Sequence, residues 1–233
     1  MTGTLVNTAA VIVGGTLGSL LGARFPVGVQ RTVMQIIGIF TLAMGVKMFL
    51  EAGNVLVVLG ALIAGGITGE LLHLEARLES LGERLKKGCG RVPFLSRGDF
   101  TRGFVTAGLV FCVGPMTVVG SMQDGLRGDP SLLVVKSVLD LFAGMAFAAG
   151  MGMGVTFAAV IVLVVQGGLT LGAETLAGVL TNAMIADMTA TGGVILLGLG
   201  LMLLDLSKAK IRAANMLPGL LFAPALSALA AAF

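Results

Sequence analysis

The sequence predicts an all-α protein: a polytopic transmembrane helical bundle of about eight spans. Hydrophobic residues make up 56% of the 233 residues, charged residues only 12%, and the mean hydropathy is +1.03. Soluble domains carry about 25% charged residues, so this composition is typical of an integral membrane protein. The apolar residues come in runs of about 20, the length at which a helix crosses a bilayer. Basic residues gather in alternate gaps between these runs.

The apolar runs leave almost nothing for a soluble domain, so we expect one transmembrane domain over residues 1–233. A β-barrel would show short alternating strands in place of such runs. The expected spans are Thr4–Ala23, Thr32–Leu50, Val55–His73, Phe104–Met122, Leu132–Met151, Val155–Gly172, Thr181–Leu206 and Ala213–Ala232.

The basic gaps predict the orientation. They follow spans one, three and seven and contain Arg24 and Arg31, the cluster from Arg77 to Arg102, and Lys208 to Arg212. With eight spans all three gaps share one face, which the positive-inside rule assigns to the cytoplasm, with both termini outside. A seven-span alternative would merge spans five and six and reverse the last basic gap. We therefore expect a break near residues 152–154.

The segment Leu74–Lys87 differs in kind from the spans. Its leucines recur at helical spacing, with glutamate and arginine between them. This pattern predicts a cytoplasmic amphipathic connector, residues 74–90, lying on the membrane surface. A docking site for a soluble partner is the alternative interpretation.

Three pairs of segments resemble one another in the same order, so spans one to three match spans six to eight. The offset of five spans is odd, which predicts an inverted repeat, the architecture of many secondary transporters. The alternative is a shared bias towards glycine, alanine and leucine. The matches are AAVIV at Ala9 and Ala158, GIFTLAMGVKM at Gly38 with GVILLGLGLML at Gly193, and NVLVVLGAL at Asn54 with NMLPGLLFA at Asn215.

Polar residues within the spans are the candidates for function, because a charge at the bilayer centre costs about 2.5–3.5 kcal/mol or more. Lys136 and Asp140 share a helix face and can pair, for structural or functional reasons. Asp187 has no evident partner in its own helix and is the first candidate for a titrating or cation-binding carboxylate. Asn7, Asn54 and Gln166 lie near the outer ends of their spans. The predicted solute- or ion-binding residues are Ser121, Gln123, Asp124, Lys136, Asp140, Asn182, Asp187 and Thr191.

Two spans also carry breaks. Gly114-Pro115 interrupts span four, because proline removes a backbone hydrogen bond, and Thr191-Gly192-Gly193 follows Asp187. Broken helices often form substrate sites in transporters, although a packing kink would leave the same pattern.

Other classes of function find little support. The sole histidine, His73, converges with no nucleophile, so we expect no enzyme. No residue spacing predicts a metal or a cofactor, and loop orientation explains the basic surplus without a nucleic-acid partner. The glycines at residues 14, 15, 18 and 22 predict close helix packing, which also allows two copies of the chain to associate.

The stretch from Val113 to Asp140 (VGPMTVVGSMQDGLRGDPSLLVVKSVLD) resembles the signature of the YqgA- and YdfK-like bacterial inner-membrane proteins. NTAAVIVGG near Asn7, GVKM around Lys47 and ANMLPGLLFAP from Ala214 fit the same family. The resemblance implies a multi-pass protein of the bacterial inner membrane and supplies no substrate. It singles out Gln123, Asp124, Lys136 and Asp140 as polar members of the signature.

These patterns favour a small secondary transporter of an ion or small polar solute, working by alternating access. The carboxylates would bind a coupling proton or cation, Lys136 would pair with a carboxylate or an anionic group, and the neutral side chains would supply hydrogen bonds. An ion channel, and a non-transporting scaffold or sensor that uses Leu74–Lys87, are the alternatives.

Overall fold

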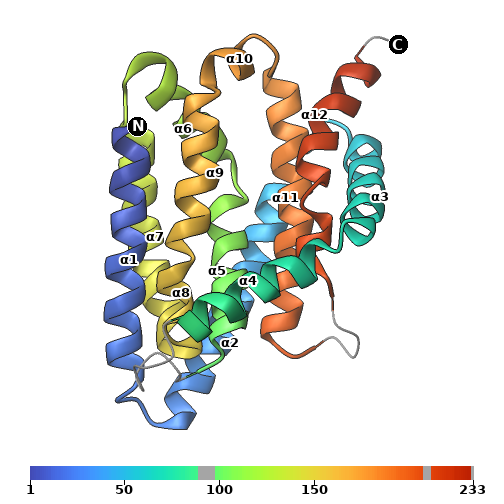
Figure 1. Cartoon of the computed structure of the whole chain (residues 1–233). Coiled ribbons are helices and arrows are strands. Elements are labelled where there is room, and N and C mark those ends of the chain that lie inside the picture. Colours follow the sequence, from blue (N-terminus) through green and yellow to red (C-terminus); the bar gives the residue numbers. More distant parts are fainter. Residues whose placement is uncertain (89–97, 207–210, 232–233) are drawn as a thin grey trace. The chain divides into compact units, whose positions relative to one another are not determined.

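A computed structural model describes residues 1–88, 98–206 and 211–231, and throughout these ranges the regular structure is helical. Residues 89–90 of the expected connector, Lys208, Lys210 and the last residue of the eighth expected span lie outside the described residues. The elements are α1 (Thr2–Gly22), α2 (Val27–Phe49), α3 (Val55–Leu71), α4 (Leu74–Gly88), α5 (Phe100–Cys112), α6 (Pro115–Arg127), α7 (Ser131–Met151), α8 (Gly154–Phe157), α9 (Ala159–Leu171), α10 (Ala173–Ala177), α11 (Asn182–Leu203), the 3₁₀ helix η2 (Ala213–Met216) and α12 (Gly219–Ala230) (Figure 1).

Within the described residues, six stretches are long and apolar enough to cross a membrane, and two bent helix pairs raise the number to as many as eight. The α5–α6 pair bends by 64° at the predicted Gly114-Pro115 break, and the α3–α4 pair bends by 55°. His73, between α3 and α4, has φ 50°, the left-handed conformation that ends a helix. The amphipathic α4 is therefore a helix separate from the apolar α3, as the sequence predicted.

The chain divides into two compact units. Unit 1 comprises residues 1–35, 79–112 and 116–178, and unit 2 comprises residues 36–78, 113–115 and 179–233. Each unit is described by itself below, and the prediction of one transmembrane domain stays a prediction.

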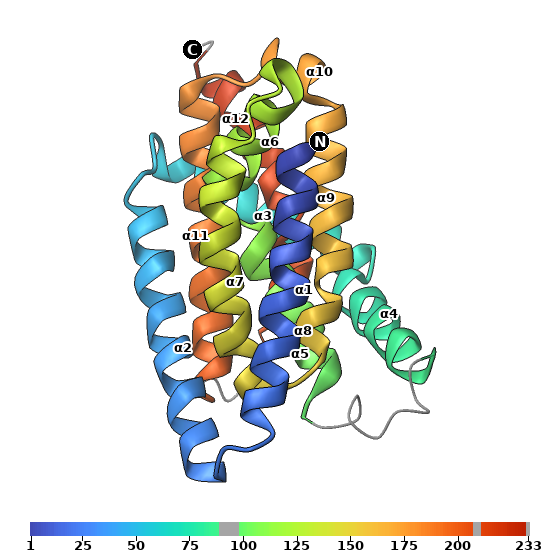
Figure 2. The same cartoon turned by 90° about the vertical axis from the view of Figure 1, so that its left-hand side faces the viewer.

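Unit 1 is built on a close, parallel contact between α1 and α7. Figure 2 shows α1 between α7 and α9. In the second half of α1 every fourth residue along this face is a glycine, and a Cβ there would lie only 2.2–2.3 Å from a carbonyl oxygen of α7. The pairs are Gly14 with Leu141, Gly18 with Met145, and Gly22 with Ala149. Only glycine permits two backbones to approach this closely.

The bent α5–α6 pair contacts α8 and α9, mainly through α5. Gly103 of α5 lies against Val155, and Gly125 of α6 lies against the carbonyl of Thr170. These two contacts have the same order along both segments, as expected if the bent pair is one broken span.

Unit 2 packs α3 against α12 and α11. The α3–α12 contact is antiparallel: Gly65 lies against Gly219, and Gly69 lies against the carbonyl of Asn215 (Figure 1). The second half of α2 runs antiparallel to α11, where Gly45 and Gly193 face each other's carbonyl oxygens.

The directions of these helices agree with eight crossings. Helices an even number of crossings apart must run parallel, as α1 and α7 do as the first and fifth. Helices an odd number apart must run antiparallel, as α3 and α12 do as the third and eighth. Between α7 and α8 the chain reverses at Gly152, which has φ 83°. The break expected near residues 152–154 is confirmed, and spans five and six are separate.

Candidate functional site

The predicted site residues fall into two groups. Unit 1 contains Ser121, Gln123, Asp124, Lys136 and Asp140, whereas unit 2 contains Asn182, Asp187 and Thr191. Whether all eight serve one site stays a prediction, so each group is built up separately.

The centre of unit 1 is an ion pair on α7. Lys136 Nζ donates to Asp140 Oδ2, and both residues are buried, with 6% and 7% of their surface exposed. The pairing expected from their four-residue spacing is confirmed. Asn7 Nδ2 on α1 donates to the same Asp140 oxygen at 2.9 Å. Asp140 Oδ2 therefore accepts hydrogen bonds both from Lys136 on its own helix and from Asn7 on the neighbouring helix α1.

Three neutral side chains near this pair have unused hydrogen-bonding capacity. Asn7, Ser121 and Gln166 are all 0% exposed. Among the described residues, no partner lies within hydrogen-bond distance of Asn7 Oδ1, Ser121 Oγ or either amide atom of Gln166. A buried amide without partners costs about 1–3 kcal/mol. Such a group needs a physical reason to be there.

Asn7 and Gln166 lie at the same depth in unit 1. Thr4 of α1 and Thr170 of α9 share a hydrogen bond of 3.1 Å between their hydroxyls. Asn7 is about one turn after Thr4, and Gln166 is one turn before Thr170. Because the two helices are antiparallel, one turn forward along α1 and one turn backward along α9 lead in the same direction. The two amides therefore occupy one layer beneath the threonine pair.

Ser121 reaches this region from α6. The preceding residue, Gly120, packs on Leu133, one turn from Lys136. We call Asn7, Ser121, Lys136, Asp140 and Gln166 the polar cluster.

Asp124 has a different environment. Its Oδ2 accepts the backbone N–H of Gly3 at 3.0 Å and lies 3.0 Å from the amino group of Met1. Negative charge stabilises the N-terminus of a helix, where backbone N–H groups have no partner within the helix. The contacts of Asp124 are those of an anion that holds the start of α1.

Asp187 does the same for α3 in unit 2. Its Oδ1 accepts the backbone N–H groups of Gly53 at 3.0 Å and Asn54 at 2.9 Å. Asn54 in turn caps α3 with its side chain, which accepts N–H bonds from Leu56 and Val57. The partners of Asp187 come from another helix, which is why its own helix offered no indication of them.

The remaining predicted residues do not gather around Asp187. Thr191 is buried, and its hydroxyl donates to the backbone carbonyl of Asp187, within the same helix. The break expected at Thr191-Gly192-Gly193 is wrong, because α11 is one unbroken helix through these residues. Asn182 is exposed, and Gln123 of unit 1 is half-buried.

Unit 2 holds a second polar junction, which the sequence did not reveal. Glu75 at the start of α4 accepts the backbone N–H of Ala214 at 2.9 Å, and its own N–H donates to Asn215 Oδ1 at 2.8 Å. Asn215 Nδ2 also donates to Glu70, which pairs with Arg212. No group of three or more histidine, cysteine, aspartate or glutamate residues in the described part of the chain is placed to hold a metal ion.

The apolar helices, their directions and their buried polar side chains define a multi-pass α-helical membrane protein. The chain belongs to the family described as "Protein of unknown function (DUF554)", whose model matches residues 2–228.

Two relatives show how widely this sequence is shared. The chain is 31% identical over 229 residues to the "Uncharacterized protein YqgA" of Escherichia coli (strain K12), covering 97% of this chain and 96% of the relative. It is 27% identical over 228 residues to the "Uncharacterized membrane protein YdfK" of Bacillus subtilis (strain 168), covering 96% and 94%. The resemblance inferred from the sequence is thus confirmed. No solved structure matches.

Proposed function

We propose that this protein is a secondary transporter of an ion or small polar solute, and that the polar cluster of unit 1 is its binding site. The observation that carries the proposal is Gln166, a fully buried amide whose donor and acceptor both lack a partner among the described residues. Polar groups at membrane depth are costly and usually serve a function. A solute with both a donor and an acceptor would satisfy Gln166.

The cluster offers complementary chemistry to such a solute. Lys136 and Asp140 supply one charge of each sign, and Asn7 Oδ1 and Ser121 Oγ supply neutral hydrogen bonds. A solute that carries opposite charges, or a cation that takes the place of Lys136 beside Asp140, fits this set. Asp140 is the carboxylate we assign to the coupling proton or cation, since Asp124 and Asp187 already accept backbone N–H groups at helix starts.

The inverted repeat would supply the two conformations that alternating access needs. Asn54 and Asn215, which begin the third pair of matched segments, both lie at the start of helical structure, before α3 and in η2 respectively. These two helical segments run antiparallel within unit 2. This arrangement supports an inverted relationship between the segments, as exchange of two halves about a site requires.

We also propose that the protein lies in the bacterial inner membrane with both termini outside. The support is the positive-inside rule: Arg24 and Arg31 follow α1, and the basic residues of α4, Arg77 to Lys87, follow α3. With eight crossings these groups share the cytoplasmic face.

The transport proposal is tested by flux in proteoliposomes. Purified full-length protein is reconstituted, and gradients of H⁺, Na⁺ and K⁺ are imposed together with a panel of radiolabelled amino acids, carboxylates and organic amines. We expect saturable uptake of at least one solute, and its loss in the charge-free variant Lys136→Met/Asp140→Asn. A complete absence of flux in the wild-type protein, or full activity in the variant, would refute the proposed site.

A further inference from the structure

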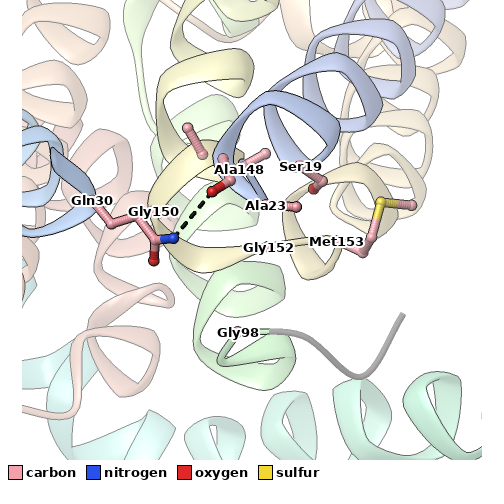
Figure 3. Close-up of a pocket in the computed structure, with 10 residues that line it drawn as sticks. Ser19, Ala23, Gln30, Gly98, Ala148, Gly150, Gly152 and Met153 are labelled. Atoms are coloured by element: carbon pink, nitrogen blue, oxygen red, sulfur yellow. Dashed lines mark hydrogen bonds between the residues drawn. The ribbon is translucent and has the colours of Figure 1, made fainter. Parts of the chain in front are cut away.

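A cavity lies in unit 1 at the C-terminal end of α7, whereas Lys136 and Asp140 of the polar cluster lie in its first half. Its volume is about 350 Å³, within the range of small-ligand sites. Figure 3 shows its lining, which is mostly backbone from glycine and alanine residues at the ends of α1 and α7. Ser19, Gln30 and Met153 are the lining residues with longer side chains.

Two helix C-termini lie at the cavity and contribute partial negative charge to it, beside the first turn of α2 at Gln30 and the N-cap of α8 at Met153. α1 ends at Gly22 and α7 ends at Met151, and because the two helices are parallel, both C-termini lie at this cavity. The last carbonyl groups of a helix have no partner within it, and they carry about half a negative charge. Neither helix has a basic residue in its last turn to offset that charge.

The polar groups of the lining are mainly acceptors. The amide nitrogen of Gln30 already donates to the carbonyl of Gly22 at 3.0 Å (Figure 3). It also donates to the carbonyl of Phe25 at 3.1 Å, which leaves Gln30 Oε1 as an acceptor. The backbone N–H groups of Ala23 and Gly152 already donate to the backbone carbonyls of Ser19 and Ala148, respectively.

Ser19 is the clearest indication of a ligand. The residue is only 5% exposed, and its hydroxyl oxygen has no hydrogen-bond partner in the described part of the chain. Carbonyl oxygens at helix C-terminal ends coordinate Na⁺ in several transporters, and a carbonyl oxygen that accepts one hydrogen bond keeps a second lone pair. The hydroxyl can offer its lone pairs to a cation, which resolves the cost of burying it unpaired.

We propose that this cavity, which we call the helix-end cavity, binds a monovalent cation through Ser19 Oγ and backbone carbonyl oxygens. Its lining contains no charged side chain among the described residues, whereas Ca²⁺ and Mg²⁺ sites normally include carboxylates. Arg24 and Arg31, the nearest described cations along the chain, are exposed and lie outside the lining. The volume accommodates an alkali ion with part of its water shell or a small protonated amine.

The helix-end cavity is separate from the polar cluster. Along α7, Asp140 precedes Ala148 by eight residues, which is about 12 Å at 1.5 Å per residue. Cation binding here therefore does not depend on the transport proposal, and each can fail without the other.

The experiment measures the thermal unfolding of the full-length protein in detergent as Na⁺, K⁺ or methylammonium replaces N-methyl-D-glucamine at constant ionic strength. We expect saturable stabilisation by an alkali ion or by methylammonium, which also tells the two sources apart. In Ser19→Ala, the apparent Kd for that cation should rise about tenfold or more, because a ligand oxygen is lost.

Two control variants complete the test. Ser137→Ala removes another buried hydroxyl on α7, one that donates to its own helix at Leu133, and should keep the affinity. The charge-free variant Lys136→Met/Asp140→Asn should keep it as well. Equal melting temperatures in all the salts, unchanged affinity in Ser19→Ala, or loss of binding in the charge-free variant would each overturn the proposal.

Discussion

Asp140→Asn is expected to lower the free energy of unfolding by about 3–5 kcal/mol, the cost of leaving a buried charge without its partner. Lys136 is 6% exposed and donates to Asp140, so the substitution leaves an ammonium group buried beside a neutral amide. Since the chain contains neither tryptophan nor tyrosine, unfolding is best followed by circular dichroism at 222 nm.

The charge-free variant tests whether the stability lost in Asp140→Asn comes from the unpaired Lys136 or from any substitution at this position. Lys136→Met/Asp140→Asn removes both charges and keeps an oxygen that can accept the Asn7 amide. It should recover at least half of the stability lost in the single variant. Asp129→Asn, in the exposed turn before α7, is the control: it keeps the oxygen that accepts two bonds from Ser131 and should change stability by no more than about 1 kcal/mol. A double variant no more stable than Asp140→Asn would show that the two charges are not coupled.

Gly18→Ala is expected to cost about 1–3 kcal/mol, because the added methyl group overpacks the contact between α1 and α7. Its Cβ would lie 2.2 Å from the backbone carbonyl oxygen of Met145, which cannot turn aside as a side chain would. The two helices must therefore move apart, and Asn7, on the same face of α1, moves away from Asp140. We expect the larger Gly18→Val to be more destabilising still, and transport to fall in both.

Gly168→Ala is the control for Gly18→Ala. Gly168 lies within α9, and nothing stands within 4 Å of a Cβ built there. Alanine favours a helix over glycine by about 1 kcal/mol, so this variant should be unchanged or slightly more stable. If thermal unfolding showed the same loss for both alanine variants, close packing of α1 on α7 would not explain the glycine spacing.

Much of the fold follows from the sequence because a bilayer imposes simple rules on it. Apolar length sets the spans, and the break at Gly114-Pro115 follows from the missing N–H group of proline. The choice of partner helix does not follow in the same way. Gly14, Gly18 and Gly22 indicate that α1 packs closely against something, but no local feature names α7 as that helix.

The sequence predicted contacts of the candidate site within one helix but not those between helices. Lys136 and Asp140 are close in sequence, so helical spacing alone predicted their contact. The partners of Asp124 and Asp187 are backbone N–H groups of other helices. A carboxylate that holds a helix start looks the same in sequence as one that binds a proton.

Asn7 and Gln166 were noted as polar residues but left out of the predicted site. A signal for Asn7 was present: it lies two turns before Gly14, on the face that carries the glycines, so it must point at the partner helix. Gln166 lies one turn from Val162 and Thr170 on the buried face of α9. A polar residue that continues a close-packing face is therefore a better candidate than one placed by depth alone.

The most direct test of the central claim is Gln166→Leu, with thermal unfolding and solute flux measured on the same preparation. If the amide is held ready for a solute, an apolar side chain of similar size removes its burial cost. The variant should then be more stable than the wild type, by about 1–3 kcal/mol, and should transport nothing. A less stable protein with normal flux would show that Gln166 is bonded within the protein, and the polar cluster would not be the binding site.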